Sequence, residues 1–554
     1  MIDRSVFIAG AAGEGVQTVG DVVARAFQVH GYAVFANKEF ESRIRGGRSS
    51  YRLRIRETPL GAPCGTADVL LAINPDAAAY YQSDVREDGW IIAPETGDRV
   101  DVIVPFRDVA VEHGGKEIYA NSAAAGALCA TLGLPLEPLT AALRAAFARY
   151  NDEIVASNVA VAAAGHRHAG AQVASRGVRQ IPARTARYAL ANTHEAIAIA
   201  AAAAGCRFMA AYPMSPSTDI ITYLAAHEDL GVFTEQAEDE IAAVNMALGA
   251  SAGGARAMTA TSGGGFALMV ESVSLAGMIE TPIVIVIAQR PGPATGLPTR
   301  TAQEDLLFAI RAGHGEFPRI VFAASDPQDA ICKTKRAFDL ADRYQTVAIL
   351  LTDQFLADSL FSVDSPMLPD GPSSQSAPPS SIPAMYARYA LTETGISPRL
   401  YIGQTEHPVI LDSDEHDETG HLTEDLRFMR PAMVEKRLEK GRRLKREMHP
   451  PQMNHCEDAE AALIGWGSTR GAIEEAVERL RATGHRVGSI HFGDLWPLPA
   501  FDFPENARYW TVEGNATGQL ASLLTAEYRV PIEGRIGRYD GLPLDAETIV
   551  KEWS

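Results

Sequence analysis

Near its middle the chain reads Tyr212-Pro213-Met214-Ser215-Pro216-Ser217-Thr218, directly after an apolar stretch at 207–211 that has strand character. Each proline ring fixes its own φ angle and restrains the residue before it, so the backbone around the intervening serine is held in place. A loop that leaves a buried strand lies at the carboxyl edge of its sheet, where open α/β sheets bind ligands. We therefore expect Ser215 to bond to a ligand oxygen, while Ser217 or Thr218 caps the helix that follows.

An acidic run follows, in which Glu238-Asp239-Glu240 precedes an alanine-rich helix predicted at 241–252. Acidic residues at a helix start complement the helix dipole, and this effect alone can account for one of them. Three in a row, close behind a predicted strand end at 233–234, indicate that one carboxyl group faces inward. Spacing alone leaves open whether that group belongs to Glu238 or to Glu240.

Two further loops follow predicted strands of the same region. The first is Ser262-Gly263-Gly264-Gly265, whose free N–H groups can hold an anion or a cofactor ring. A plain glycine turn with a serine cap would produce the same sequence. The second loop spans 290–300, is ordered by its prolines and ends in Arg300. A guanidinium group there can bind a substrate carboxylate through two parallel hydrogen bonds.

Strands that alternate with helices predict the α/β class, with doubly wound parallel sheets covered by helices on both faces. In the central region we expect strands at 207–211, 231–234, 255–261, 283–288, 320–323 and 347–351. The expected organisation is an α/β domain at 1–178, a second α/β domain at 179–363, a Pro/Ser-rich linker at 364–389 and a C-terminal α/β domain at 390–554. An Ala- and Arg-rich connector is expected at about 165–187.

The first domain opens with a glycine-rich turn at Gly10–Gly15 between a predicted strand and a predicted helix. Its spacing is G-x-x-G-x-G, whereas the dinucleotide fingerprint is G-x-G-x-x-G. Glu14 also places negative charge where a pyrophosphate would bind. A close-packed strand–helix turn is therefore expected in preference to a nucleotide site.

Composition excludes several classes of protein. The 554 residues carry a formal net charge of −19, which disfavours nucleic acid as a partner because no basic excess offsets phosphate repulsion. No membrane-spanning stretch and no signal peptide are evident, so we expect a cytoplasmic protein. The five cysteines are scattered singly, which argues against disulfides and against a metal or iron–sulfur site within this chain. The basic run at 436–446 alternates with glutamates and predicts a solvated helix face.

In this order the motifs resemble the α subunit of 2-oxoacid:ferredoxin oxidoreductases, especially the 2-oxoglutarate branch. Residues 1–178 resemble that family's γ domain, fused ahead of α. The segments that carry the resemblance are 212–216, 238–243, 261–264 and 290–300, together with Arg45-Gly46-Gly47, Gly395–Arg399, Glu415–Gly420 and Glu513–Gln519.

The resemblance implies thiamine diphosphate chemistry, with a pyrimidine-binding domain at 179–363 and a transketolase-like C-terminal domain at 390–554. It implies that Glu240, with Glu238 as the alternative, hydrogen-bonds the aminopyrimidine ring. The implied binding residues are Ser262 and Gly263 for the cofactor, and Tyr212, Ser215 and Arg300 for the 2-oxoacid. Serine stands at position 215 where the family usually has threonine.

The chain lacks the Gly-Asp-Gly element with which thiamine enzymes anchor the diphosphate through Mg²⁺. The resemblance therefore implies a separate β subunit that carries the diphosphate, Mg²⁺ and a [4Fe–4S] cluster, in an (αβ)₂ assembly. Coenzyme A is the implied co-substrate and ferredoxin the implied electron acceptor. The alternatives are another 2-oxoacid such as pyruvate as the substrate, or a non-catalytic assembly subunit.

Overall fold

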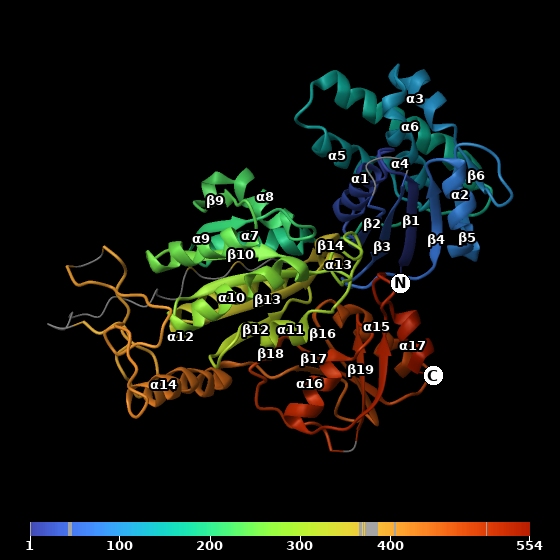
Figure 1. The fold of residues 1–554 in the computed structure, drawn as a ribbon. Helices are drawn as coiled ribbons and strands as arrows, with labels where there is room; N and C mark the ends of the chain where they lie inside the picture. The colour runs from blue at the N-terminus through green and yellow to red at the C-terminus, as the bar shows by residue number, and fades with distance from the viewer. Residues whose placement is uncertain are drawn as a thin grey trace. The chain divides into compact units, whose positions relative to one another are not determined.

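The computed structural model describes residues 2–42, 47–364, 368, 371, 386–403, 406–505 and 507–553. The chain divides into two compact units (Figure 1). One consists of Met1–Asn192, Asp358–Pro366 and Asp545–Thr548, and the other of Thr193–Ala357, Met367–Leu544 and Ile549–Ser554. Most of the linker predicted at 364–389 lies outside the described residues, as do Arg45 and Gly46.

An eight-stranded mixed sheet forms the centre of the first unit, in the order β6-β5-β4-β1-β3-β2-β14-β7. Its strands are β1 (Asp3–Ala11), β2 (Ala33–Phe40), β3 (Arg48–Arg56), β4 (Ala67–Ala72), β5 (Val85–Ala93), β6 (Val102–Ile103), β7 (Ala189–Asn192) and β14 (Ser359–Val363). The strands from β6 to β1 run parallel, and the pairings from β1 to β7 are antiparallel. The stretch 179–363 therefore supplies two strands, β7 and β14, to this sheet.

Helices cover this sheet on both faces. On one face, α1 (Val16–Val29), α3 (Phe106–Gly114), α4 (Ala120–Thr131), α5 (Leu136–Ala146) and α6 (Asp152–Ala174) share an apolar core, and α2 (Pro75–Tyr81) belongs to the core of the other face. In the turn after β1, the Glu14 carboxylate accepts hydrogen bonds from the Ala11 N–H at 2.8 Å and from the Asn74 amide at 2.6 Å. The turn is thus closed by its own side chain.

The connector predicted at 165–187 is wrong as far as Ala174, because α6 continues to that residue. Two glycines explain how an Ala-rich segment becomes a buried helix. A Cβ atom at Gly126 of α4 would clash with the Ala162 carbonyl, and one at Gly165 of α6 would clash with the Ala123 carbonyl. Small residues let the two helix backbones approach closely, and that contact leaves little amphipathic pattern in the sequence.

The second unit is built on a seven-stranded sheet in the order β18-β12-β13-β11-β10-β8-β9. The strands are β8 (Cys206–Ala211), β9 (Phe233–Gln236), β10 (Arg256–Thr261), β11 (Ile283–Gln289), β12 (Arg319–Ala323), β13 (Val347–Asp353) and β18 (Asp494–Trp496). All neighbours are parallel except β18, which pairs antiparallel with β12. The predicted α/β class and the six predicted central strands are confirmed, with ends shifted by at most two residues.

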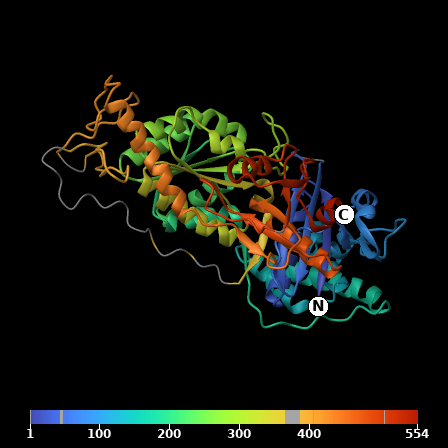
Figure 2. The same cartoon turned by 90° about the horizontal axis from the view of Figure 1, so that it is seen from below.

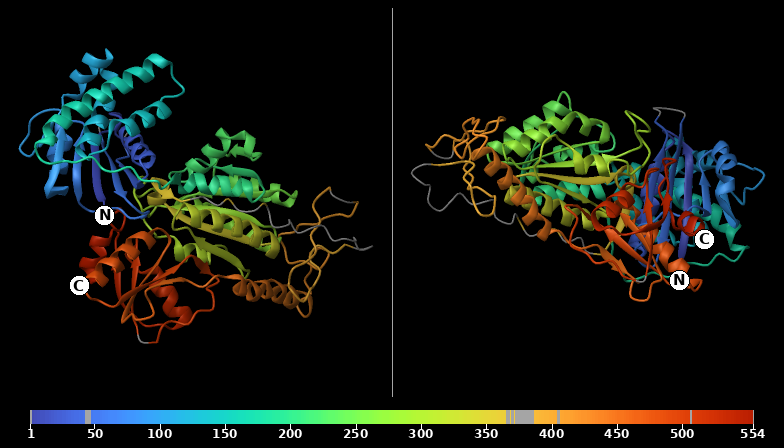
Figure 3. Two further views of the ribbon diagram at one scale, coloured as in Figure 1. Left: turned by 180° about the vertical axis from the view of Figure 1, so that it is seen from behind. Right: turned by 60° about the horizontal axis from the view of Figure 1, so that its bottom comes forward.

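Helices lie on both faces of this sheet (Figures 2 and 3). They are α7 (Thr193–Ala203), α8 (Thr218–Ala226), α9 (Glu240–Ala252), α10 (Gly263–Met278), α11 (Leu306–Arg311), α12 (Pro327–Tyr344) and α13 (Gln354–Ala357). Helices α9, α10 and α11 share one core with β11 and β13, whereas α7 packs on α12. No helix in the described ranges is long and apolar enough to cross a bilayer.

A second sheet in this unit has five strands in the order β15-β17-β16-β19-β20. Its elements are β15 (Gln452–Asn454), β16 (Ala461–Trp466), β17 (Val487–Phe492), β19 (Arg508–Glu513), β20 (Ile532–Gly537), α15 (Arg470–Ala482) and α16 (Gln519–Tyr528), whereas α17 (Ala546–Trp553) has residues in both units. The core of this sheet, with Trp466 and Phe492, is continuous with the α10–β11 core. The two sheets are therefore stabilised together.

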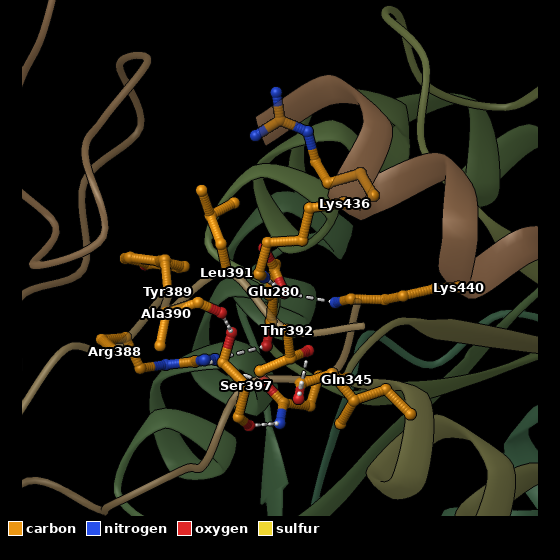
Figure 4. A network of polar contacts seen from close by, with 12 residues as sticks. Glu280, Gln345, Arg388, Tyr389, Ala390, Leu391, Thr392, Ser397, Lys436 and Lys440 are labelled. Atoms are coloured by element: carbon orange, nitrogen blue, oxygen red, sulfur yellow. Dashed lines mark hydrogen bonds and ion pairs between the residues drawn. The ribbon is translucent and has the colours of Figure 1, made fainter. Parts of the chain in front are cut away.

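A buried ion network joins α14 (Met429–Leu444) to the residues just after α10 (Figure 4). The Glu280 carboxylate accepts hydrogen bonds from the Lys436 ammonium at 2.5 Å and from Lys440, and all three side chains are about 1% exposed. Arg388 donates to the Glu280 carbonyl at 2.7 Å and to the Gln345 side chain at 2.8 Å. Burial opposes ionisation of Glu280, but the two lysines outweigh it and hold its pKa well below the usual range.

The solvated face predicted at 436–446 is therefore wrong for Lys436 and Lys440, which point into the protein. Burial also lowers the pKa of Lys440 to about 7, although Glu280 opposes the shift. Nearby, Glu415 accepts hydrogen bonds from Arg437, and His416 packs on the Tyr389 ring with 3.9 Å between centroids. The charged sequence at 415–418 thus belongs to the packing of this region.

We expect Glu280→Gln to destabilise the second unit by about 3–5 kcal/mol, because it leaves two buried ammonium groups without a counter-charge. Glu435→Gln on α14, the helix that carries Lys436 and Lys440, is the matched control, since the Glu435–Arg442 pair at 3.1 Å is more than half exposed on both sides. An exposed pair is worth about 0–1 kcal/mol. Denaturant unfolding of both variants measures the difference, and equal midpoints would contradict it.

Candidate functional site

Four neighbouring parallel strands, β11, β10, β8 and β9, bring their carboxyl ends to one edge of the seven-stranded sheet. The segments that follow them are the ones singled out in the sequence. They are 290–300 after β11, 262–265 after β10, 212–218 after β8 and 238–240 after β9. Parallel topology therefore places every predicted site segment at this edge, the usual ligand-binding edge of such sheets.

The loop after β8 presents its first half to solvent and anchors its second half. Tyr212 is 40% exposed and Ser215 is exposed, whereas Ser217 is buried. Ser217 occupies the N-cap position of α8, but its hydroxyl donates to the Met214 carbonyl at 2.8 Å and makes no cap bond. Ser217, one of the two predicted caps, is therefore the N-cap residue but does not make the cap bond with its side chain, and Ser215 is exposed at the edge.

The acidic run after β9 divides into three environments. Glu238 is exposed, and Asp239 is the N-cap of α9, accepting a hydrogen bond from the Ala242 N–H at 2.7 Å. Glu240, the first residue of α9, is 3% exposed. Within the described part of the chain, its buried Oε1 has no hydrogen-bond partner. The inward-facing carboxyl group is therefore that of Glu240.

A glycine turn at the start of α10 receives this carboxyl group. A Cβ atom at Gly265 would lie 2.5 Å from Glu240 Oε1 and would also clash with the Thr261 hydroxyl. Ser262 stands at the N-cap position without a cap bond, and its buried hydroxyl donates to the Met214 sulfur at 2.6 Å. The glycine turn is thus a close approach between α9 and α10, and Ser262 links it to the loop after β8.

The arginine in contact with the Ser215 loop is Arg290, which the sequence reading did not select. Its guanidinium donates to the Ser215 carbonyl at 2.8 Å, and burial lowers the pKa of Arg290. Arg300 is half-buried at the far end of the same loop, where its backbone N–H donates to the Leu297 carbonyl at 3.1 Å. The available signal was the position of Arg290 directly after a buried strand.

The loop that follows Arg300 is tied to the five-stranded sheet. Gln303 exchanges two hydrogen bonds with Gly514, at 2.7 Å from its backbone N–H and at 2.8 Å to its side-chain oxygen. Glu513 accepts hydrogen bonds from the N–H groups of Leu520 and Ala521, at 2.7 and 3.1 Å. The Glu513–Gln519 motif therefore holds this loop and the start of α16 in position.

Comparison with known proteins identifies the class. Residues 199–436 match the family model described as pyruvate flavodoxin/ferredoxin oxidoreductase, thiamine diphosphate-binding, and residues 5–168 match that of pyruvate ferredoxin/flavodoxin oxidoreductase. The 2-oxoacid:ferredoxin oxidoreductase 2 subunit alpha of Aeropyrum pernix is 31% identical, with 98% of this chain and 96% of that protein covered. The chain belongs to the family of 2-oxoacid:ferredoxin oxidoreductase α subunits.

The names of two relatives include a substrate, 2-oxoglutarate. The 2-oxoglutarate oxidoreductase subunit KorA of Mycobacterium tuberculosis is 30% identical and covers 95% of this chain and 87% of its own length. A solved 2-oxoglutarate:ferredoxin oxidoreductase from Magnetococcus marinus, with 2-oxoglutarate, coenzyme A and succinyl-CoA bound, superposes with a TM-score of 0.92. It is 30% identical and covers 100% of this chain and 99% of that one.

The residues at the edge fit the pyrimidine half of thiamine diphosphate. Glu240 offers a buried carboxylate oxygen that no described group satisfies, which suits a ring N–H donor. The absence of a Cβ atom at Gly265 is what lets this carboxylate approach the backbone of α10. Glu240 is therefore the predicted residue of this chain whose chemistry fits the ring.

We expect Gly265→Ala to disturb this site more than Gly264→Ala does. The added methyl group at 265 meets Glu240 Oε1 at 2.5 Å, and overpacking of this kind costs about 1–3 kcal/mol. At 264 the nearest group is the Ala294 carbonyl at 3.5 Å, an ordinary contact. Thermal unfolding compares the two variants, and a Gly264→Ala variant that is the less stable of the two would contradict the packing argument.

Proposed function

We propose that the chain is the α subunit, with a fused γ-type domain, of an enzyme that acts on 2-oxoglutarate. The reaction converts 2-oxoglutarate, coenzyme A and oxidised ferredoxin reversibly into succinyl-CoA, CO₂ and reduced ferredoxin, with two electrons passing to ferredoxin and one proton, that of the coenzyme A thiol, released per turnover. The observation that carries the proposal is the unsatisfied Glu240 oxygen on the glycine turn, inside the region matched by the thiamine diphosphate-binding family model. The names of the Mycobacterium tuberculosis and Magnetococcus marinus relatives support 2-oxoglutarate.

When bound, thiamine diphosphate supplies the carbon nucleophile and the electron sink for decarboxylation of a 2-oxoacid. The role we assign to Glu240 is to hold a proton at the ring nitrogen, which shifts the ring towards the tautomer with a basic imino group. Glu238 is exposed and is not assigned this role. General acid–base groups of this kind contribute about 10²–10⁴-fold to a rate.

The substrate is bound by groups of the loops after β8 and β11. Ser215 offers its hydroxyl to an oxygen of the 2-oxoacid, Tyr212 borders it, and Arg290 fixes the backbone beneath Ser215. A loop with an arginine at each end, Arg290 and Arg300, suits a substrate with two carboxylates. This charge pattern favours 2-oxoglutarate over pyruvate, which has one carboxylate.

The partner is a separate β subunit that holds the diphosphate, Mg²⁺ and a [4Fe–4S] cluster. We propose that it covers the exposed side of α9 and α10, the helices that carry Glu240 and Gly263. Ile241 and Met246 of α9 are 49% and 42% exposed, and Leu268 of α10 is 51% exposed. Apolar side chains on neighbouring helices favour a partner over water. An (αβ)₂ assembly in the cytoplasm completes the proposal.

The function is tested by co-purifying the chain with its β partner and following anaerobic reduction of a viologen dye. We expect turnover that needs 2-oxoglutarate, coenzyme A and both subunits. Turnover with pyruvate but not with 2-oxoglutarate would show that pyruvate is the substrate instead. A partner that turns over at full rate without this chain would assign the chain to assembly and overturn the proposal.

In that assay we expect Glu240→Gln to lower kcat by about 10²–10⁴-fold, because the amide cannot take up and return the ring proton. Glu238→Gln is the control, since its side chain is exposed on the same turn and should leave kcat within about twofold. Near-normal turnover of Glu240→Gln, with cofactor binding intact, would reject the role of Glu240.

We expect substitutions of the two arginines to change the kinetic constants differently. We expect Arg300→Ala chiefly to raise KM for 2-oxoglutarate, because it removes binding shared by ground state and transition state. Arg290→Ala should lower kcat as well, since the Ser215 carbonyl then loses its 2.8 Å hydrogen bond and the loop shifts. Steady-state kinetics of both variants with 2-oxoglutarate decides, and identical effects would remove the positioning role from Arg290.

A further inference from the structure

Asp305 is a second acidic group at the glycine turn of α10, and neither the sequence motifs nor the role of Glu240 accounts for it. Its carboxylate lies directly on Gly263, because a Cβ atom there would come within 2.5 Å of both Oδ1 and Oδ2. The backbone of Asp305 is held in place, since its N–H donates to the buried Gln289 side chain at 3.0 Å. Asp305 is thus held against the turn by the end of β11.

The carboxylate of Asp305 is only partly satisfied. Its Oδ2 is buried and finds no hydrogen-bond donor among the described residues, the same situation as Oε1 of Glu240. Its neighbour Glu304 differs, because Glu304 accepts a hydrogen bond from the Gly292 N–H at 2.8 Å. Leaving a buried acceptor without a donor is unfavourable, so such groups are found where a ligand or a function uses them.

Three acceptors surround the three glycines of this turn. Glu240 Oε1 lies against Gly265, and the Ala294 carbonyl is 3.5 Å from where a Cβ atom of Gly264 would be. Asp305 lies against Gly263. Residues two apart in a helix are rotated by about 200° about its axis, so Asp305 and Glu240 flank the first turn of α10 from different sides. A ligand that seats there needs several N–H donors and gains nothing from negative charge.

We infer that Asp305 is a further cofactor-binding residue of this half-site, which accepts a hydrogen bond from an N–H group of the aminopyrimidine ring. The inference rests on the proposed function, since it assigns a second acceptor to the same cofactor. It explains why glycine stands at 263 as well as at 265. It also explains why Oδ2 of Asp305 lacks a donor within the described chain.

The cofactor-free chain gives the first test. Burial, with a smaller effect of Glu304, raises the pKa of Asp305 from 3.8 to about 6. An acid whose pKa rises on folding destabilises the fold fully above its folded pKa, and this cost disappears as the pH falls towards the unfolded pKa. Asp305→Asn should therefore raise Tm by about 2–4 °C at pH 7.5, and the gain should vanish towards pH 4.

The complete complex gives the second test. With the β subunit present, we expect Asp305→Asn to weaken binding of thiamine diphosphate about 10- to 100-fold, the loss expected for a charge-assisted hydrogen bond. Binding is read from the cofactor-dependent rise in Tm, which needs no turnover. Glu304→Gln is the matched control, because it removes an adjacent charge whose partner is a backbone N–H.

Each outcome has one meaning. Weaker cofactor binding by Asp305→Asn alone, with the stabilised cofactor-free chain, supports the inference. Equal binding by wild type and Asp305→Asn, while wild-type turnover persists, overturns it and leaves the proposed function standing. A β subunit that cancels the Tm gain before cofactor is added assigns the donor to the partner and also overturns it. A wild-type complex that binds no thiamine diphosphate overturns both.

Discussion

The carboxyl group of Glu240 lies against the backbone of Gly265, and the rest of the site depends on this contact. An acid can be buried there only because residue 265 has no Cβ atom and because α9 and α10 follow neighbouring parts of one parallel sheet. Leaving its Oε1 without a donor costs about 1–3 kcal/mol, which the surrounding packed core offsets. The unfavourable free energy of the site is therefore concentrated at the contact between Glu240 and the start of α10.

The first residues of helix α10 have low helix propensity, whereas the residues just past its end are held by a buried ion network. Its first three residues are glycines, each less favourable than alanine in a helix by up to about 1 kcal/mol. Just past its other end, Glu280 is held by Lys436 and Lys440 in a buried ion network. Asn245 of α9 also donates to Ser272 of α10 at 3.0 Å. These contacts fix the position of a helix whose glycine turn could not fix itself.

Sequence patterns predicted the central sheet well, because continuous apolar runs such as 283–288 are typical of buried parallel strands. They also selected Ser215, at the end of a strand, and narrowed the inward-facing acid at the start of a helix to Glu238 or Glu240. They failed where long-range packing decides. α6 was missed because its contacts with α4 use small residues, and Lys436 and Lys440 were assigned to solvent because their counter-charge, Glu280, is distant in sequence. Arg290 and Asp305 could not be selected without their partners, the Ser215 carbonyl and Gly263.

The polar groups at this edge of the sheet favour one end of thiamine diphosphate over the other. Around the glycine turn the chain presents acceptors, namely Glu240, Asp305 and the Ala294 carbonyl, which suit a ring bearing N–H donors. The same acceptors repel a diphosphate, whose oxygens need cations or free N–H groups. This pattern supports the proposal that the chain holds the ring, while a second subunit bound at the exposed apolar side of α9 and α10 brings the diphosphate end.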